Sequence, residues 1–232
     1  MKSIDKQYKT LYTINMTTLS QEVKKMPTST FNNLNKAKQK RIFQAALDEF
    51  ARADYEHAKL SHIIKQANIP RGSFYQYFED KYDLYSYLIN QIGQDKLSYM
   101  SDTLKNPNNV TFLQWFKEIY KVGIRFALDN PKYVQISAHL LTKKGEIYNK
   151  VMKGNIDIAL DMYQSMIKKD QELGIIKKEI NARLLAKLVL DMTLNVSTES
   201  LSSTDGTFNL EEMNKQIDQI ISIFEKGITK GE

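Results

Sequence analysis

Apolar residues recur every three or four positions along most of the chain, which is the spacing of amphipathic helices. Ile42, Ala46 and Phe50 share one face of a helix predicted over residues 36–53. The alternation of Val134, Ile136 and Ala138 would also fit a strand, but the Asn-Pro start of that segment favours a helix, so the pattern predicts an all-α fold. Further helices are predicted over 59–67, 70–78 and 81–104, and from near residues 111, 131, 147, 181 and 209.

Composition narrows the class further. Only 9 of the 232 residues are glycine and 4 are proline, too few for the frequent turns of a β-sandwich or barrel. Cysteine is absent, which excludes disulfides and thiolate metal sites and suits a cytoplasmic protein. No apolar run approaches the roughly 20 residues of a membrane span, and the first 25 residues lack the apolar core of a signal peptide.

Positive charge is concentrated in the first third of the chain. The net charge is +6, to which residues 1–35 and 36–82 each contribute +3, whereas residues 83–232 are charge-balanced. An anionic partner is therefore expected to bind the N-terminal part. Residues 1–34 show no usable periodicity and are predicted to be a flexible extension, the first 25 of them outside the fold.

Two short helices joined by a tight turn are predicted over residues 59–78. Asn68 lies at the turn, where a left-handed backbone is needed, and asparagine tolerates that conformation second only to glycine. Phe74 and Phe78 are four residues apart and are expected to pack inward. The outward residues form a donor-rich face without an acid, as contact with DNA phosphates and base edges requires: Arg71, Ser73, Tyr75, Gln76 and Tyr77.

The helix that follows begins with a second candidate for a phosphate contact. Asp80 is predicted to cap this helix, with Asp83 at its third position and Lys81 at its first. The ammonium group of Lys81 would then reach outward, next to the positive end of the helix dipole.

These features together resemble the DNA-binding domain of the TetR (tetracycline-repressor-like) family of bacterial transcription regulators. The resemblance covers residues 36–92, about a quarter of the chain, and agrees in order, spacing and residue type. It is carried by Arg41, Ile42, Ala45, Ala46, Phe50, Tyr55, Ile63, Ala67, residues 72–78, Lys81 and Leu84.

The resemblance implies which side chains meet DNA. In the family, the positions of Arg71, Ser73, Tyr75, Tyr77 and Lys81 touch the DNA backbone, and the region of Gln76 reads bases. Lys59 stands near a position that usually holds a serine or threonine cap, so that contact is either missing or made by Lys59. The candidate DNA-binding residues are Lys59, Arg71, Gly72, Ser73, Tyr75, Gln76, Tyr77 and Lys81.

The resemblance also implies two domains: a three-helix DNA-binding domain over 35–80 and a larger helical ligand-binding and dimerisation domain over 81–232, linked by helix 81–104. An aromatic and methionine-rich set forms either the core of the larger domain or a ligand pocket: Phe112, Trp115, Phe116, Ile119, Phe126, His139, Met162 and Met166. The last two helices are expected to pair with a second copy through Leu185, Leu188, Met192, Ile217, Ile221 and Phe224.

Two functions stay open at this point. The first is a dimeric repressor that an apolar or amphipathic small molecule releases from a pseudo-palindromic double-stranded DNA operator. The second is a protein-interaction or nucleoid-associated module on the same fold without small-molecule control. Because catalytic motifs are absent and the three histidines lack metal-ligand spacing, neither an enzyme nor a metal or other cofactor is expected.

Overall fold

The computed structural model of the protein describes residues 27–105, 107–143, 145–201 and 210–228. These residues form helices and no β-strand, which confirms the all-α fold. They divide into a smaller unit, residues 27–97 and 130–151, and a larger unit, residues 98–129 and 152–228. The division differs from the boundary expected after residue 80, because 81–97 and 130–151 group with the N-terminal helices.

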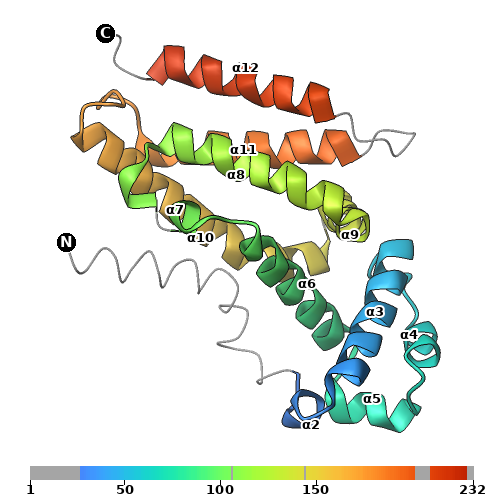
Figure 1. The fold of residues 1–232 in the computed structure, drawn as a ribbon. Helices are drawn as coiled ribbons and strands as arrows, with labels where there is room; N and C mark the ends of the chain where they lie inside the picture. Colours follow the sequence, from blue (N-terminus) through green and yellow to red (C-terminus); the bar gives the residue numbers. More distant parts are fainter. Residues whose placement is uncertain (1–26, 106, 144, 202–209, 229–232) are drawn as a thin grey trace. The chain divides into compact units, whose positions relative to one another are not determined.

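The smaller unit is built around the two short helices and the elements that pack on them (Figure 1). Helix α9 packs on α3, and Phe74 and Phe78 are fully buried, as expected. Its helices are α2 (Ser29–Asn32), α3 (Lys36–Arg52), α4 (Leu60–Gln66), α5 (Arg71–Tyr77), α6 (Lys81–Ser98) and α9 (Pro131–Thr142).

Helix α2 corrects the expectation that residues 1–34 form a flexible extension, which is wrong for residues 27–34. Phe31 is only 1% exposed and packs against the rings of Tyr77 and Phe78. The hydroxyl of Thr28 donates to the carbonyl of Gln76 at 2.7 Å, and the Thr28 N–H donates to that of Tyr77 at 3.2 Å. The expectation for residues 1–25 lies outside the described residues.

The helix predicted over residues 81–104 is shorter than expected. Helix α6 ends at Ser98, and a short helix α7 (Asp102–Lys105) follows. Ser101 starts this second helix as its cap, because its hydroxyl accepts from the Leu104 N–H at 3.3 Å and its carbonyl accepts from Lys105 at 3.0 Å. A 3-10 turn, η2 (Pro107–Asn109), leads on to the next helix.

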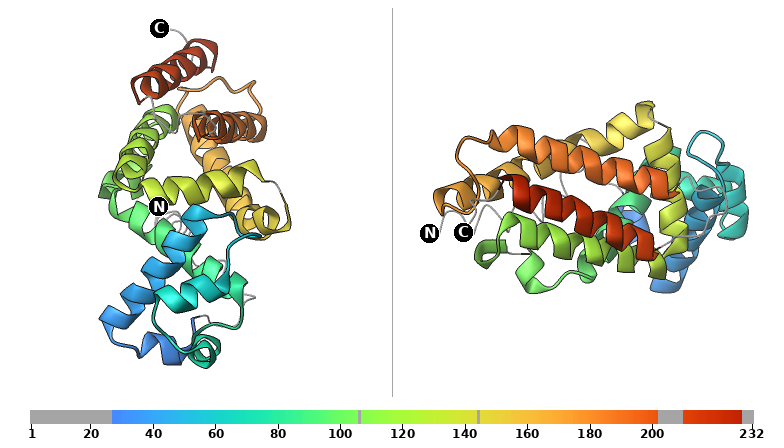
Figure 2. Two further views of the ribbon diagram at one scale, coloured as in Figure 1. Left: turned by 90° about the vertical axis from the view of Figure 1, so that its right-hand side faces the viewer. Right: turned by 90° about the horizontal axis from the view of Figure 1, so that it is seen from above.

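Long helices make up the larger unit, and α12 lies against α8 (Figure 2). Thr111 and Gln114 form the predicted capping box, each side chain accepting from the backbone N–H of the other. Lys117 of α8 pairs with Asp218 of α12 at 2.9 Å. The helices are α8 (Phe112–Asp129), α10 (Glu146–Glu172), whose first turns belong to the smaller unit, α11 (Ala182–Leu201) and α12 (Leu210–Ile228).

The core of the larger unit is aromatic. Trp115 is 2% exposed and donates its indole N–H to the carbonyl of Leu104 at 3.0 Å. Phe112 and Trp115 both meet the ring of Tyr163 edge-on. Asp170 is 1% exposed and accepts from the backbone N–H of Phe112 at 2.7 Å, so it joins α10 to the start of α8. Burial raises the pKa of Asp170.

No helix among the described residues is long and apolar enough to cross a membrane.

Candidate DNA-binding surface

The turn between α4 and α5 has the backbone that the sequence requires. Asn68 has a φ of 51°, in the left-handed region, as predicted. The turn is closed by the Asn68 N–H on the carbonyl of Lys65 at 3.1 Å and by the Ile69 N–H on that of Ile64 at 3.3 Å. Arg41 of α3 donates to the carbonyl of Ala67 at 3.1 Å, so the end of α4 is fixed to α3. The turn therefore holds α5 in a defined direction.

The outer face of α5 is open and free of acidic side chains. Arg71, Gly72 and Gln76 are exposed, Tyr75 is 50% exposed, and Ser73 is half-buried. Apart from its neighbours and the backbone of its own helix, a Cβ added at Gly72 would meet nothing within 4 Å, so packing does not require glycine there. A bare backbone at an exposed position permits the close approach of another molecule.

Tyr77 is a correction, because the expectation that it faces outward is wrong. Its side chain is only 3% exposed. Tyr77 follows Phe74 by three residues and so lies on the same side of the helix, and the ring of Phe31 covers it edge-on at 6.1 Å. The ammonium of Lys38 lies 5.5 Å from the centre of the Tyr77 ring. The spacing from Phe74 was the signal for this inward position.

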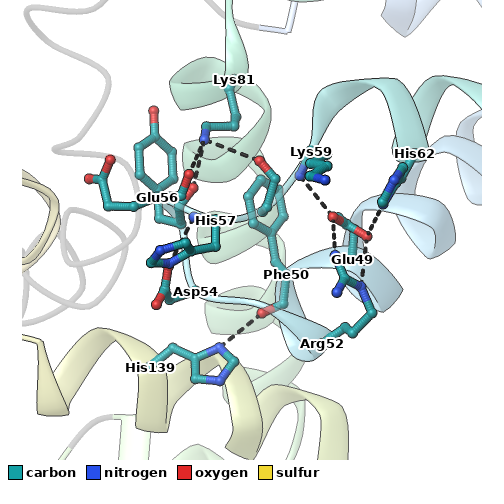
Figure 3. Close-up of polar contacts among 12 residues, drawn as sticks. Glu49, Phe50, Arg52, Asp54, Glu56, His57, Lys59, His62, Lys81 and His139 are labelled. Carbon is teal, nitrogen blue, oxygen red and sulfur yellow. Dashed lines mark hydrogen bonds and ion pairs between the residues drawn. The ribbon is translucent and has the colours of Figure 1, made fainter.

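The ammonium group of Lys81 is engaged inside the protein (Figure 3). Its Nζ donates to the carbonyls of Tyr55 at 2.7 Å, Ala58 at 3.2 Å and Glu56 at 3.3 Å. It also lies 4.5 Å from the centre of the Tyr55 ring. Lys81 thus holds the segment between α3 and α4. The predicted capping by Asp80 is present, since its carboxylate accepts from the Asp83 N–H at 2.9 Å.

Glu49 is the buried carboxylate that sequence analysis missed (Figure 3). It accepts from the guanidinium of Arg52 at 2.6 Å and from the backbone N–H of Lys59 at 2.8 Å, and it lies 3.3 Å from a ring nitrogen of His62. Burial alone would raise the pKa of Glu49, but these hydrogen bonds lower it to about 2. Glu49 supplies the acceptor at the start of α4, where Lys59 has no capping side chain of its own.

One face of α9 is bonded to α3 and to the segment that follows it. Lys132 pairs with Asp48 at 2.5 Å. Two turns further along, His139 Nδ1 lies 3.2 Å from the carbonyl of Phe50, which can only accept, so Nδ1 carries the proton. Lys143, just past the end of the helix, pairs with Asp54. Because these polar contacts recur at helical spacing, they fix α9 to α3 and to the segment that follows α3.

The predicted pocket residues belong to both units. Phe112, Trp115, Phe116, Phe126, Met162 and Met166 are buried in the larger unit, and Ile119 is half-buried there. His139 belongs to the smaller unit and bonds to Phe50. The aromatic stripe of α8 is therefore first of all core, one of the two outcomes that the sequence left open.

The predicted dimer residues also fall into two groups. Leu185, Ile217 and Ile221 are at most 4% exposed and are part of the chain's own core, so they cannot form an open contact surface. Leu188 is 47% exposed, and Met192 and Phe224 are half-buried. Two further apolar side chains of these helices, which the sequence prediction did not include, are exposed: Leu184 at 57% and Ile223 at 68%.

The arrangement of α3, α4, α5 and the turn defines a helix-turn-helix protein with an exposed, acid-free second helix. Residues 42–88 match the model of the bacterial regulatory proteins of the tetR family. The HTH-type transcriptional regulator YdgC of Bacillus subtilis is 27% identical over 171 residues, covering 71% of this chain and 81% of YdgC.

Solved structures agree with this. A TetR-family transcriptional regulator from Chloroflexus aurantiacus shares 25% identity with a TM-score of 0.61, covering 89% of this chain and all of the other. FadR from Bacillus subtilis, solved with stearoyl-CoA, shares the fold with a TM-score of 0.66 and 17% identity, covering 82% of this chain and 98% of FadR. Residues 42–88 thus match the DNA-binding domain of the TetR family, and along most of its length the chain is similar to transcriptional regulators of that family.

Proposed function

We propose that the chain is a dimeric repressor whose α5 enters the major groove of a pseudo-palindromic operator and which a small molecule releases from DNA. The observation that carries the DNA-binding part is the open outer face of α5, where Arg71 and Gln76 are exposed beside the bare backbone of Gly72. Arg71 supplies a charge for phosphate, whereas the amide of Gln76 can pair with adenine.

The candidate DNA-binding residues have two different roles, according to whether they are exposed or buried. Arg71, Ser73 and Tyr75 position the protein on the DNA backbone, and Lys59 is exposed at the start of α4 as a further phosphate contact. Tyr77 and Lys81 support this surface from inside, through packing on α2 and through the carbonyls before α4. In this assignment the two residues orient the reading helix without themselves bonding to DNA.

The exposed apolar side chains of the last two helices support a dimer. Leu184 and Leu188 follow each other by one turn on α11, and Ile223 is 68% exposed on α12. Exposed apolar residues grouped on two neighbouring helices typically mark a contact with a partner. A symmetric dimer would place two copies of α5 about one helical turn of DNA apart.

A charge placed on this surface tests the dimer without disturbing the core. Ile223→Glu and Leu188→Glu should give folded monomers in analytical ultracentrifugation. Leu173→Glu, which places the same charge at a side chain 63% exposed after α10, is the matched control and should leave the dimer intact. Folded, fully dimeric Ile223→Glu and Leu188→Glu proteins would refute this interface.

An effector site in the larger unit is supported by one buried polar atom. The hydroxyl of Tyr120 has no hydrogen-bond partner among the described residues, although the side chain is only 8% exposed, and burial raises its pKa to about 12. Its neighbour on α8 is the ring of Phe116. A buried hydroxyl among aromatic rings suits a ligand that is largely apolar and carries a hydrogen-bonding group.

Release from DNA would follow from a population shift. The chain passes between the units at residues 97/98, 129/130 and 151/152. An effector that prefers one arrangement of the larger unit can therefore act on α6, α9 and the start of α10. DNA affinity falls in proportion to that preference.

The experiment begins with an operator selected from random DNA. Fluorescence anisotropy of that operator is then followed while long-chain fatty acids and their thioesters are added. A saturable loss of binding supports the repressor. Operator binding that no such compound alters would favour the second candidate, a module without small-molecule control, and failure to select any sequence would refute specific DNA binding.

A further inference from the structure

A pocket of about 90 Å³ lies in the smaller unit, away from the outer face of α5. One wall is the segment of residues 54–56 after α3, and residues from the end of α9 and the start of α10 form the other: His139, Leu140, Lys143, Gly145, Glu146, Ile147 and Tyr148. Both walls belong to the same compact unit. Neither the DNA surface nor the proposed effector site uses this pocket.

The inner wall of the pocket is aromatic and aliphatic. Tyr55, Tyr85 and Tyr148 line it together with Leu140 and Ile147. Burial raises the pKa of Tyr85, with nearby Tyr55 and Asp54 adding to the rise. Tyr85 therefore remains neutral, and the three tyrosines present ring surfaces, which attract cations through their quadrupoles.

Acidic side chains also line the pocket, next to the aromatic wall. Asp54 pairs with Lys143, and Glu146 pairs with Lys150 at 2.7 Å, so these four charges balance in pairs. Glu56 also lines the pocket and has no ion-pair partner among the described residues. Glu56 is therefore the described carboxylate of the pocket lining that has no ion-pair partner.

Acidic side chains also act on the ring of Tyr55. Burial, together with the charges of Asp80, Glu56 and Glu146, raises the pKa of Tyr55 to about 12. The described cations near the wall are engaged: Lys81 with the Tyr55 carbonyl and ring, and Lys143 with Asp54. His57, also paired with Asp54, is largely exposed on its outer side.

We propose that this pocket binds the ammonium head of a small alkylammonium compound. The aromatic wall receives the alkyl groups, and Glu56 compensates the charge. A methylated ammonium is weakly hydrated and spreads its charge over apolar groups, so it suits a pocket with both properties. A bare metal ion does not, because the described residues contain no group of three metal-ligating side chains.

The volume of the pocket limits the size of the group it can hold. Benzene occupies an engineered cavity of about 150 Å³, and water takes about 30 Å³ of the liquid. A pocket of about 90 Å³ therefore accepts an ammonium head with a few methyl groups, with any longer chain directed to solvent. Because the segment of residues 54–56 leads into α4, a bound ligand also stabilises the position that Lys81 holds.

Tetramethylammonium chloride is the probe that tests this site in the full-length protein. Its neutral counterpart of similar shape is tert-butanol, and sodium chloride controls for ionic strength. We expect millimolar tetramethylammonium, and neither control, to shift the NMR signals of certain backbone amides in a saturable way and to raise Tm. These amides are those of Tyr55, Glu56, Leu140 and Tyr148. Equal responses to tert-butanol would show a merely apolar hollow, and no response to tetramethylammonium would exclude the site; either result overturns the proposal.

Variants test whether the charge of Glu56 or the shape of the pocket determines the binding of tetramethylammonium. Glu56→Gln should weaken tetramethylammonium binding about fivefold, or about 1 kcal/mol, as expected for a unit charge close by in a water-exposed site. Tyr148→Leu should weaken it as well. Glu179→Gln, which removes an exposed carboxylate of the larger unit, should change nothing. Unchanged binding in Glu56→Gln would overturn the proposal even where the probe binds.

Discussion

Both units have aromatic cores, and they differ in the side chains that fix the ends of their helices. In the smaller unit, single polar side chains bond to backbone groups at the ends of helices: Lys81 to three carbonyls, Glu49 to the Lys59 N–H, and Arg41 to the Ala67 carbonyl. In the larger unit, the indole of Trp115 donates to the carbonyl of Leu104, and Asp170 accepts from the N–H of Phe112 at the start of α8. The bonds of the smaller unit lie around the helix-turn-helix, so they fix the orientation of the candidate DNA-binding helix α5.

The largest effect is expected in the aromatic core. Trp115→Ala should destabilise the protein by about 3–5 kcal/mol, because it removes a large side chain that is 2% exposed and leaves a cavity. Denaturant unfolding followed by circular dichroism measures this, since the substitution removes the chain's only tryptophan. Tyr75→Ala is the matched aromatic control and should stay within about 0.5 kcal/mol, because Tyr75 is half-exposed. Similar losses in both variants would contradict the assignment of Trp115 to the core.

A smaller loss of stability is expected when the buried carboxylate of Glu49 in the smaller unit is neutralised. Glu49→Gln should cost about 1–3 kcal/mol at pH 7, because the bonds to Arg52 and Lys59 lose their charged acceptor. The folded pKa of about 2 lies below the ordinary 4.5, so the ionised Glu49 stabilises the fold above pH 4.5. That contribution is lost as the pH falls from 4.5 towards 2.

The pH dependence provides the control for Glu49. Thermal unfolding of the wild type and of Glu49→Gln should converge as the pH falls through this range, whereas Glu56→Gln should follow the wild type throughout. A constant gap between wild type and Glu49→Gln from pH 6 to pH 2.5 would show that ionisation of Glu49 does not stabilise the fold.

Substitution of Lys81 tests whether its ammonium supports the fold or contacts a DNA phosphate. Lys81→Ala should destabilise the fold by about 1–2 kcal/mol, since three carbonyls lose a charged donor. It should leave the slope of log K against log salt unchanged, because its ammonium releases no counterion from DNA. Arg71→Ala should do the reverse, with stability kept and the slope reduced by about one unit. A reduced slope in Lys81→Ala would place its ammonium on a phosphate after all.

The smallest expected change in stability has the opposite sign. Gly72→Ala should stabilise the helix by about 0.5–1 kcal/mol, because nothing apart from its neighbours and the backbone of its own helix lies within 4 Å of the new Cβ. The same methyl group should weaken DNA binding if the backbone there approaches DNA closely. Thermal unfolding and anisotropy on one protein sample measure both effects, and a stabilised protein with unchanged DNA affinity would exclude close approach at this position.

The sequence predicted the helix-turn-helix well because its signals are local. The left-handed Asn68, the buried pair Phe74 and Phe78, and the cap by Asp80 each depend on residues a few positions apart. Contacts between distant segments could not be predicted in this way. The bonds of Thr28 to the end of α5 and of Lys81 to the segment before α4 bridge 48 and 26 residues.

Because contacts between distant segments cannot be read from local spacing, some of the predicted dimer residues of the larger unit were assigned wrongly. Helical spacing marked Leu185, Ile217 and Ile221 as apolar positions, but it does not say whether the chain itself or a second copy covers them. The structure covers them within the chain and leaves Leu188 and Ile223 exposed instead. Periodicity identifies a buried face, and only the packing of the other helices identifies its partner.

The central claim is that α5 reads DNA with Gln76 while the residues behind it only hold the helix. The most direct measurement compares Gln76→Ala with Lys81→Ala on the selected operator and on random DNA over a range of salt. Gln76→Ala should cost about 1–3 kcal/mol on the operator alone, with an unchanged salt slope. Lys81→Ala should leave the salt slope unchanged on both DNAs, because its ammonium bonds to backbone carbonyls and not to phosphate. Equal losses for Gln76→Ala on operator and random DNA would contradict base recognition by this helix.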